Sequence, residues 1–176
     1  IGADICPREN CFELFTNSKT GELLGGELSK LLQESDFNIF NLECPLADKS
    51  SPIKKLGANF RAPKACAQGL KSMRVDLVTL ANNHFLDYGE KGALNTLRIC
   101  KKYGIDVVGA GVDYHDASRV LYKTIKGVKL ALINCCEHEF SIATESTAGS
   151  NPLNPIQQYY AIKEARENAD YVLIIV

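Results

Sequence analysis

The sequence predicts a layered α/β domain in which most strands pair in parallel. Short runs rich in Val and Ile recur between turn residues, which is typical of buried strands. Stretches with helical periodicity separate several of these runs, and alternating strands and helices favour a parallel sheet covered by helices. Two further apolar runs meet at Lys126-Gly127, which is typical of a tight hairpin turn, so one antiparallel pair is also expected.

Strands are predicted in six segments, of which the first contributes only the end of a strand. They lie at 1–5, 38–42, 75–80, 105–108, 128–133 and 171–176. Helices are predicted in four of the intervals, at 28–32, 63–70, 92–103 and 155–168. Pro63 suits a first helical turn, and Gly104 stands where the third helix is expected to stop. Two stretches rich in Gly, Ser, Pro and Asn, 45–59 and 141–155, are expected to be functional loops.

Length, charge and cysteine usage exclude several classes of protein. The chain has 176 residues, with 20 Lys+Arg and 21 Asp+Glu, which gives a net charge of −1. This length fits a single domain, residues 1–176. The near-neutral charge argues against a surface for nucleic acid, and no apolar run approaches the ~18 residues of a membrane-spanning helix. The seven cysteines are an odd number without a Cys-x-x-Cys pair, which indicates free thiols in a reducing compartment.

Polar side chains follow three successive predicted strands at the points where these strands end. In chain order they are Asp4, Asn41, Glu43, Asn82, Asn83, His84 and Asp87. In an open α/β sheet, ligands bind just beyond the carboxyl ends of the strands. Carboxylate, amide and imidazole groups are ligands of hard or borderline divalent metals, so the sequence predicts a metal site at this edge.

Each of these residues also has a purely structural explanation. Asp4 and Asp87 could cap helices or form turns, Asn82 and Asn83 could satisfy a tight turn, and a single His84 is commonly a hydrogen-bonded structural residue. Their joint placement favours the metal site. The later cluster Glu137, His138 and Glu139 could reach the same edge, but a loop role is favoured, and His115 is expected in a turn or at a helix start.

Several motifs resemble the bacterial CapA-type capsule synthesis proteins. They are Ala3-Asp4, Asn41-Leu42-Glu43-Cys44-Pro45-Leu46, Asn59-Phe60-Arg61-Ala62-Pro63, Leu80-Ala81-Asn82-Asn83-His84-Phe85-Leu86-Asp87-Tyr88-Gly89 and Gly109-Ala110-Gly111. This family is associated with poly-γ-glutamate capsule biosynthesis and looks like a branch of the calcineurin-like metallophosphoesterases. The resemblance covers essentially the whole chain.

The resemblance implies a layered α/β/β/α sandwich with a site for two divalent metal ions (Mn, Fe, Zn or Mg) at the strand ends. It assigns Asp4 to the first metal, Glu43 to a position between the metals, and Asn83 to the second metal. His84 would contact the substrate phosphate or protonate the leaving group, and Asp87 would fix the tautomer of His84. The residues expected at the substrate are Asn41, Arg61 and Asn82.

The sequence departs from the family pattern in two ways. The phosphoesterase motif usually has His two residues after the first Asp, and this position is Cys6, which could be a ligand or be uninvolved. A His-Gly-type segment and a paired-His segment, which supply further imidazole ligands, are absent from the 176 residues. The chain is therefore expected to be the N-terminal part of a longer domain and a poor catalyst by itself.

The resemblance implies metal-dependent hydrolysis of a phosphoester, or a related transfer, in capsule synthesis. An anionic phosphoester or polyglutamate-related substrate and the capsule synthesis machinery would be its partners. The alternative is a non-catalytic assembly or binding component with a degenerate metal site, and a third interpretation explains all these residues as caps and turns. The location stays open, because the resemblance suggests the cell envelope whereas the free cysteines suggest the cytoplasm.

Overall fold

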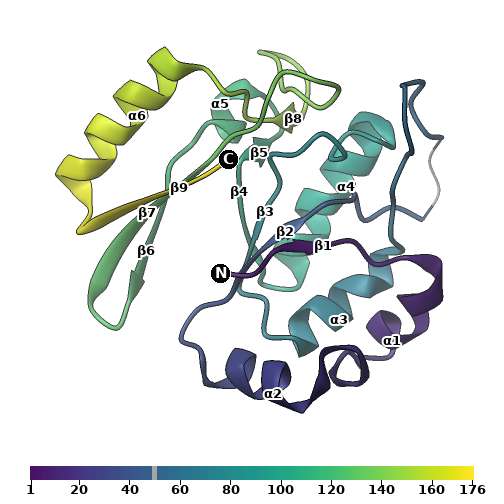
Figure 1. Cartoon of the computed structure of the whole chain (residues 1–176). Helices are drawn as coiled ribbons and strands as arrows, with labels where there is room; N and C mark the ends of the chain where they lie inside the picture. Colours follow the sequence, from purple (N-terminus) through teal and green to yellow (C-terminus); the bar gives the residue numbers. More distant parts are fainter. Residues whose placement is uncertain (49–50) are drawn as a thin grey trace.

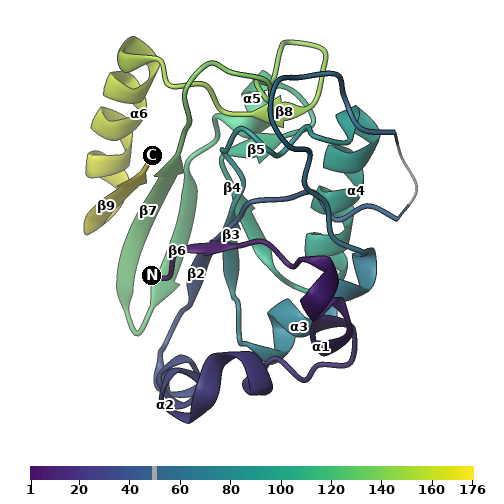
Figure 2. The ribbon, with the colours of Figure 1, turned by 45° about the vertical axis from the view of Figure 1, so that its right-hand side comes forward.

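The computed structural model describes residues 1–48 and 51–176 and places two main sheets face to face (Figures 1 and 2). The first sheet is fully parallel and has its four strands in chain order. These strands are β1 (Asp4–Ile5), β2 (Ile39–Leu42), β3 (Leu77–Thr79) and β4 (Asp106–Val108). The register sets Asp4 opposite Asn41 and Asn41 opposite Thr79, so the carboxyl ends of β1 to β3 meet at one edge.

The second sheet is mixed and has the strand order β6-β7-β9. It consists of β6 (Leu121–Ile125), β7 (Val128–Asn134) and β9 (Tyr171–Ile175). β6 and β7 form the predicted hairpin, and both turn residues have positive φ, 48° at Lys126 and 85° at Gly127. This is the conformation of a type I′ turn, whose twist matches that of the flanking strands. β9 pairs with β7 in parallel.

Six α-helices, two 3-10 helices (Glu9–Cys11 and Lys64–Cys66) and one small antiparallel pair complete the described chain. The helices are α1 (Phe12–Thr16), α2 (Gly21–Glu34), α3 (Ala67–Ser72), α4 (Gly89–Lys102), α5 (Tyr114–Ala117) and α6 (Pro155–Asn168). The small pair joins β5 (Ala110–Gly111) and β8 (Gly149–Ser150). Among the described residues no helix is long and apolar enough to cross a membrane.

Three apolar clusters separate the layers. The largest packs one face of the parallel sheet, including Leu42 and Val78, against helices α1 to α4. The second fills the space between the two sheets and contains Leu77 and Leu132. The third packs Ile133 of the second sheet against α6. Neighbouring residues of one strand enter different clusters because side chains alternate between the faces of a sheet. The order of layers is therefore α/β/β/α, which confirms the predicted fold class.

Most elements lie where the sequence predicted them, with ends that differ by a few residues. The clearest difference in length is α2, which begins at Gly21 and is kinked at Gly25 (φ 69°, ψ 170°), so the predicted helix around Leu28 is its second part. The sequence did not predict α1 or the β5–β8 pair, and β8 lies inside the predicted loop 141–155. These elements have two to five residues, too few to show a period. Residues 49 and 50 of the other predicted loop lie outside the described residues.

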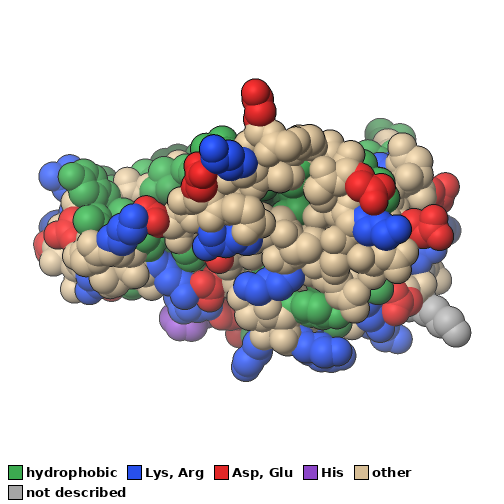
Figure 3. Space-filling model, turned by 90° about the horizontal axis from the view of Figure 1, so that it is seen from below, with side chains coloured by type: hydrophobic (Ala, Val, Ile, Leu, Met, Phe, Trp, Pro, Cys, Tyr) green, Lys and Arg blue, Asp and Glu red, His purple; other side chains and the backbone are tan. Residues whose placement is uncertain are grey.

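The surface and the thiols agree with the composition. On the face shown in Figure 3, Lys and Arg side chains are interspersed with Asp and Glu, as a net charge of −1 suggests. All seven cysteines are free, as predicted. Burial raises the pKa of Cys66, Cys100 and Cys136 to about 12. These three thiols therefore stay protonated at neutral pH.

Candidate functional site

A pocket of about 320 Å³ lies at the carboxyl ends of β1, β2 and β3. Five of the eight predicted site residues line it, namely Asp4, Asn41, Glu43, Asn82 and Asn83. They come together because β1, β2 and β3 are parallel neighbours, so their last residues and the turns that follow share one edge. The opposite wall comes from Asn134 and Ile175 of the second sheet and from Glu137 in the segment after β7.

Asn41 and Asn82 form a hydrogen-bonded frame for this pocket. Asn41 Nδ2 donates to Asp4 Oδ1 at 2.8 Å, and Asn41 Oδ1 accepts from Asn82 Nδ2 at 3.0 Å. Asn82 Nδ2 also donates to the carbonyl of Leu42, and Asn82 Oδ1 accepts the N–H of His84 at 3.1 Å. The two amides thus hold Asp4 and the 82–84 turn in place. This makes them residues that position the site.

Three of the predicted side chains in the pocket keep oxygen atoms that remain available to a ligand. Within the described residues, neither the Glu43 carboxylate nor the Asn83 amide has a side-chain hydrogen bond, and Asp4 uses only Oδ1. Two carboxylates and one amide oxygen form a hard donor set with two negative charges, which suits a cation such as Mg²⁺ or Mn²⁺. The part of the chain that the structure describes has no group of three or more His, Cys, Asp or Glu side chains placed to hold a metal ion. These residues therefore fit a metal in chemistry but supply only part of a coordination shell.

His84 and Asp87 lie next to the pocket without lining it. His84 Nδ1 lies 2.7 Å from Asp87 Oδ2, and the same oxygen accepts the N–H of Phe60 at 2.6 Å. Because a carboxylate can only accept, Nδ1 carries the proton and Nε2 is the basic nitrogen of neutral His84. The imidazole also stacks on the Phe60 ring at 4.1 Å between centroids. These contacts fix both the tautomer and the orientation of the ring.

Lys55 completes this cluster, although no pattern in the sequence marks it. Its ammonium pairs with Asp87 Oδ1, donates to the carbonyl of Asn83 at 3.4 Å, and lies 3.3 Å from His84 Nδ1. The Lys55 side chain is 2% exposed and that of Asp87 is 0% exposed. A buried carboxylate needs such a partner to remain ionised. Lys55 therefore ties Asp87 to the turn that carries Asn83.

Two other predicted residues lie elsewhere. Arg61 donates to the carbonyls of Ala47 and Asp48, at 3.2 and 2.8 Å, and is not among the residues that line the pocket. Cys6 does not line the pocket either; a hydrogen bond to the thiol of Cys44 is the main cause that lowers the pKa of Cys6. The structure thus brings neither side chain to the expected ligands.

Asn134 and Glu137 are two further pocket residues. Asn134 Oδ1 accepts the N–H of Ala81 at 2.8 Å, and Asn134 Nδ2 donates to the carbonyl of Ile175 at 3.1 Å. This side chain therefore joins the two sheets beside the pocket. The rule that found Asp4 and Asn41, a polar residue at the end of a strand, would also have found Asn134. Glu137 is exposed and lines the pocket, whereas His138 does not.

The chain matches a family model described as "Bacterial capsule synthesis protein PGA_cap" over residues 10–176. It is 31% identical over 157 residues to the capsule biosynthesis protein CapA of Bacillus anthracis, which covers 84% of this chain and 38% of that protein. It is 28% identical over 166 residues to the PGA biosynthesis protein CapA of Bacillus subtilis (strain 168), which covers 92% of this chain and 44% of that protein. The chain thus spans less than half the length of these curated relatives.

Two solved structures are similar to part of the chain. One is a 5'-nucleotidase precursor from Thermus thermophilus, with a TM-score of 0.45 and 14% identity over 61% of this chain and 22% of that chain. The other is the NAD nucleotidase of Haemophilus influenzae, with a TM-score of 0.44 and 20% identity over 63% of this chain and 21% of that chain.

Proposed function

Because the chain belongs to the bacterial capsule synthesis protein family PGA_cap, we propose that it acts in capsule synthesis through metal-dependent phosphoester chemistry. The relatives in Bacillus are named for capsule and PGA biosynthesis, which supports the biological setting. One observation carries the chemical part of the proposal. Asp4, Glu43 and Asn83 line one pocket, and Asp4 Oδ2, the Glu43 carboxylate and the Asn83 side-chain oxygen have no hydrogen-bond partner among the described residues.

In this proposal Asp4, Glu43 and Asn83 hold one or two divalent cations. Their oxygen donors favour Mg²⁺ or Mn²⁺ over Zn²⁺ and Fe²⁺, which more often take imidazole or thiolate ligands. When bound, such ions supply positive charge to a phosphate group and activate a water molecule. Asn41 keeps the Asp4 carboxylate in place, and Asn82 keeps the turn that carries Asn83 in place. Arg61 stays a predicted anion-binding residue, although its side chain now contacts the loop at Ala47 and Asp48.

His84 is the proposed proton donor or acceptor at the oxygen of the leaving group. Asp87 holds the proton at Nδ1, which makes Nε2 the nitrogen that exchanges a proton with substrate. The stacking on Phe60 and the pair between Lys55 and Asp87 restrict movement of the ring during this exchange. Positioning of this kind is a large part of the effect of a general acid or base.

The second candidate function is a non-catalytic component of the capsule machinery. The observation in its favour is that no group of three or more His, Cys, Asp or Glu side chains in the described residues could hold a metal ion. In this case the polar pocket would bind a ligand without reaction, and His84 would serve the stability of the turn.

Hydrolysis of an aryl phosphate by the full-length protein in the presence of Mn²⁺ distinguishes the two functions. We expect His84→Ala to lower kcat by about 10²–10⁴, the usual contribution of a general acid or base. His115→Ala, which removes an exposed histidine of α5, is the matched control and should leave kcat unchanged. Equal rates for the native protein and His84→Ala would remove His84 from the mechanism. Absence of turnover in a metal-bound protein would favour the assembly component.

A further inference from the structure

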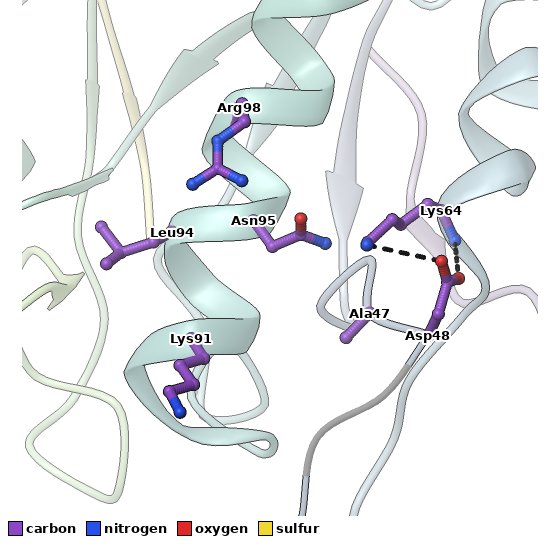
Figure 4. A pocket seen from close by; sticks show the side chains of 7 residues that line it. All are labelled: Ala47, Asp48, Lys64, Lys91, Leu94, Asn95 and Arg98. Carbon is purple, nitrogen blue, oxygen red and sulfur yellow. Dashed lines mark hydrogen bonds and ion pairs between the residues drawn. The ribbon is translucent and has the colours of Figure 1, made fainter.

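Two hollows away from the strand-end pocket differ in their chemistry. One, of about 380 Å³, lies beside α4, where Arg98 and the Asp48–Lys64 pair give it charged walls (Figure 4). The other, of about 410 Å³, lies between α5, β6 and α6, which are labelled in Figure 1, and shares no residue with the strand-end pocket. We call it the α6 hollow, and the lining residues that bear on its chemistry are Tyr114, Tyr122, Asn151, Gln157, Tyr160 and Glu164.

One face of α6 forms a wall of the α6 hollow. The side chain of Asn154 accepts two backbone N–H groups of the first turn, and Pro155 begins the helix, so the start of α6 is well defined. Side chains three and four residues apart lie on the same face of a helix. This spacing brings Gln157, Tyr160 and Glu164 to one side, and all three line the hollow. The helix therefore presents an amide, an aromatic ring and a carboxylate to the same space.

Two buried polar atoms of residues that line this hollow have no hydrogen-bond partner in the described part of the chain. Asn151 is 3% exposed, and its Nδ2 donates to the carbonyl of Asn134 at 2.9 Å, whereas its Oδ1 accepts no hydrogen bond. The hydroxyl of Tyr122, on β6, is likewise buried without a partner. Because an unsatisfied buried polar atom is unfavourable, a ligand hydroxyl group that reaches either atom would be stabilised there.

The charges around the α6 hollow disfavour a charged ligand of either sign. Glu164 has no cationic partner within the described residues and would repel an anion, while the guanidinium of Arg119 is engaged by Asp116 at 3.6 Å. The ammonium of Lys129 lies 5.2 Å from the centroid of the Tyr122 ring, so a cationic ligand would meet a like charge at this ring. The hollow therefore suits a neutral ligand.

We propose that the α6 hollow binds a neutral carbohydrate. Three tyrosines, one serine and three amide side chains are among the thirteen residues that line it. Their hydroxyl and amide groups both donate and accept hydrogen bonds, as every hydroxyl group of a sugar does. The faces of the tyrosine rings are weakly negative and suit the C–H groups of a sugar ring. The volume lies in the range of small-molecule sites, and the proposal does not rest on the phosphoester chemistry.

Saturation-transfer difference NMR with the full-length protein tests the proposal. The probes are the methyl glycosides of glucose, galactose, mannose and N-acetylglucosamine, and at least one of them should bind. Its Kd should be the same in about 0.1 M and 1 M salt, because a neutral ligand is not affected by screening. Tyr160→Ala should raise this Kd about three- to tenfold, the usual contribution of one aromatic contact. Tyr160 is 62% exposed, so this variant should keep the fold.

Tyr159→Ala is the matched control. Tyr159 lies on the same helix and is also 62% exposed, but it does not line the α6 hollow, so its removal should leave Kd unchanged. Equal loss of affinity in both variants, or unchanged affinity in Tyr160→Ala, would overturn the proposal. Absence of binding for all four glycosides would also overturn it. So would tetramethylammonium or adenosine that displaces the glycoside at a concentration below its Kd, because the hollow would then prefer a cation or a flat base.

Discussion

Lys55 and Asp87 form an ion pair beside His84 whose side chains are 2% and 0% exposed. The pair links a loop to the turn after β3, and both residues contact the imidazole of His84. Asp87 thereby keeps a charged partner and a fixed position in a place that water does not reach. The orientation of His84 depends on this pair, which makes it the support of the proposed catalytic group.

Removal of one member of this pair should destabilise the protein strongly. We expect Lys55→Met to lower the free energy of unfolding by about 3–5 kcal/mol, because the buried Asp87 carboxylate would lose the cation that faces its Oδ1. Lys54→Met, at the exposed neighbouring position, should change it by no more than about 0.5 kcal/mol. Urea denaturation measures both variants.

The double variant Lys55→Met, Asp87→Leu provides the next test of the ion pair. The double variant should lose less free energy of unfolding than the sum of the losses in Lys55→Met and Asp87→Leu, because it retains neither buried charge. Strict additivity in this cycle would show that the two side chains do not depend on each other.

Gly109 should tolerate alanine poorly because of its contact with Asn134. Both Gly109 and Gly127 have positive φ, 83° and 85°, so alanine is strained at either position. Only at Gly109 would the new Cβ collide with the side chain of Asn134, whereas Gly127 faces open space. We expect Gly127→Ala to lower the free energy of unfolding by about 1 kcal/mol, and Gly109→Ala to lower it by about 1–3 kcal/mol more than that. Similar melting temperatures for the two variants would contradict the close packing of Asn134.

The buried thiols should make the protein less stable in alkali. Cys66, Cys100 and Cys136 have pKa values of about 12 in the folded protein, against an ordinary value of 9.0. A raised pKa means that stability is complete below pH 9 and falls as the unfolded chain ionises its thiols between pH 9 and 12. At pH 10, ionisation of each of these thiols in the unfolded chain should lower the free energy of unfolding by about 1.4 kcal/mol.

Comparison of Cys100→Ala with the native protein isolates one of these thiols. The variant should be less stable at pH 8 because a buried sulfur is lost, but its loss of stability from pH 8 to pH 10 should be smaller than that of the native protein by about 1.4 kcal/mol. Parallel pH profiles for the two proteins, measured by urea denaturation, would show that Cys100 does not titrate as its burial implies.

The sequence alone was sufficient to predict the layers of the fold and much of the pocket. Val- and Ile-rich runs alternate with helical periodicity, and parallel strands bring their ends to one edge, so the order of residues alone groups Asp4, Asn41 and Glu43. Position along the chain does not reveal which of these side chains are free. The hydrogen bonds show that Asn41 and Asn82 support the pocket and that Glu43 and Asn83 face it without a partner among the described residues.

The positions of Lys55 and Arg61 could not be predicted from the sequence. Lys55 lies in a loop without periodicity, and only the fold brings it to Asp87, so no local pattern marks it as buried. Arg61 belongs to a recognisable motif, but its guanidinium donates hydrogen bonds to the loop carbonyls of Ala47 and Asp48. In both cases the decisive partner is distant in sequence and comes from a segment without regular structure.

Binding of Mn²⁺, followed by isothermal titration calorimetry, tests the central claim most directly. The native protein should bind the ion, and Asp4→Asn combined with Glu43→Gln should abolish binding, because two neutral amides replace the two carboxylates assigned to the metal. Glu167→Gln, at an exposed position of α6, should bind as the native protein does. Native protein that takes up no Mn²⁺, or a double variant that binds it with unchanged affinity, would contradict the assignment of this pocket as a metal site.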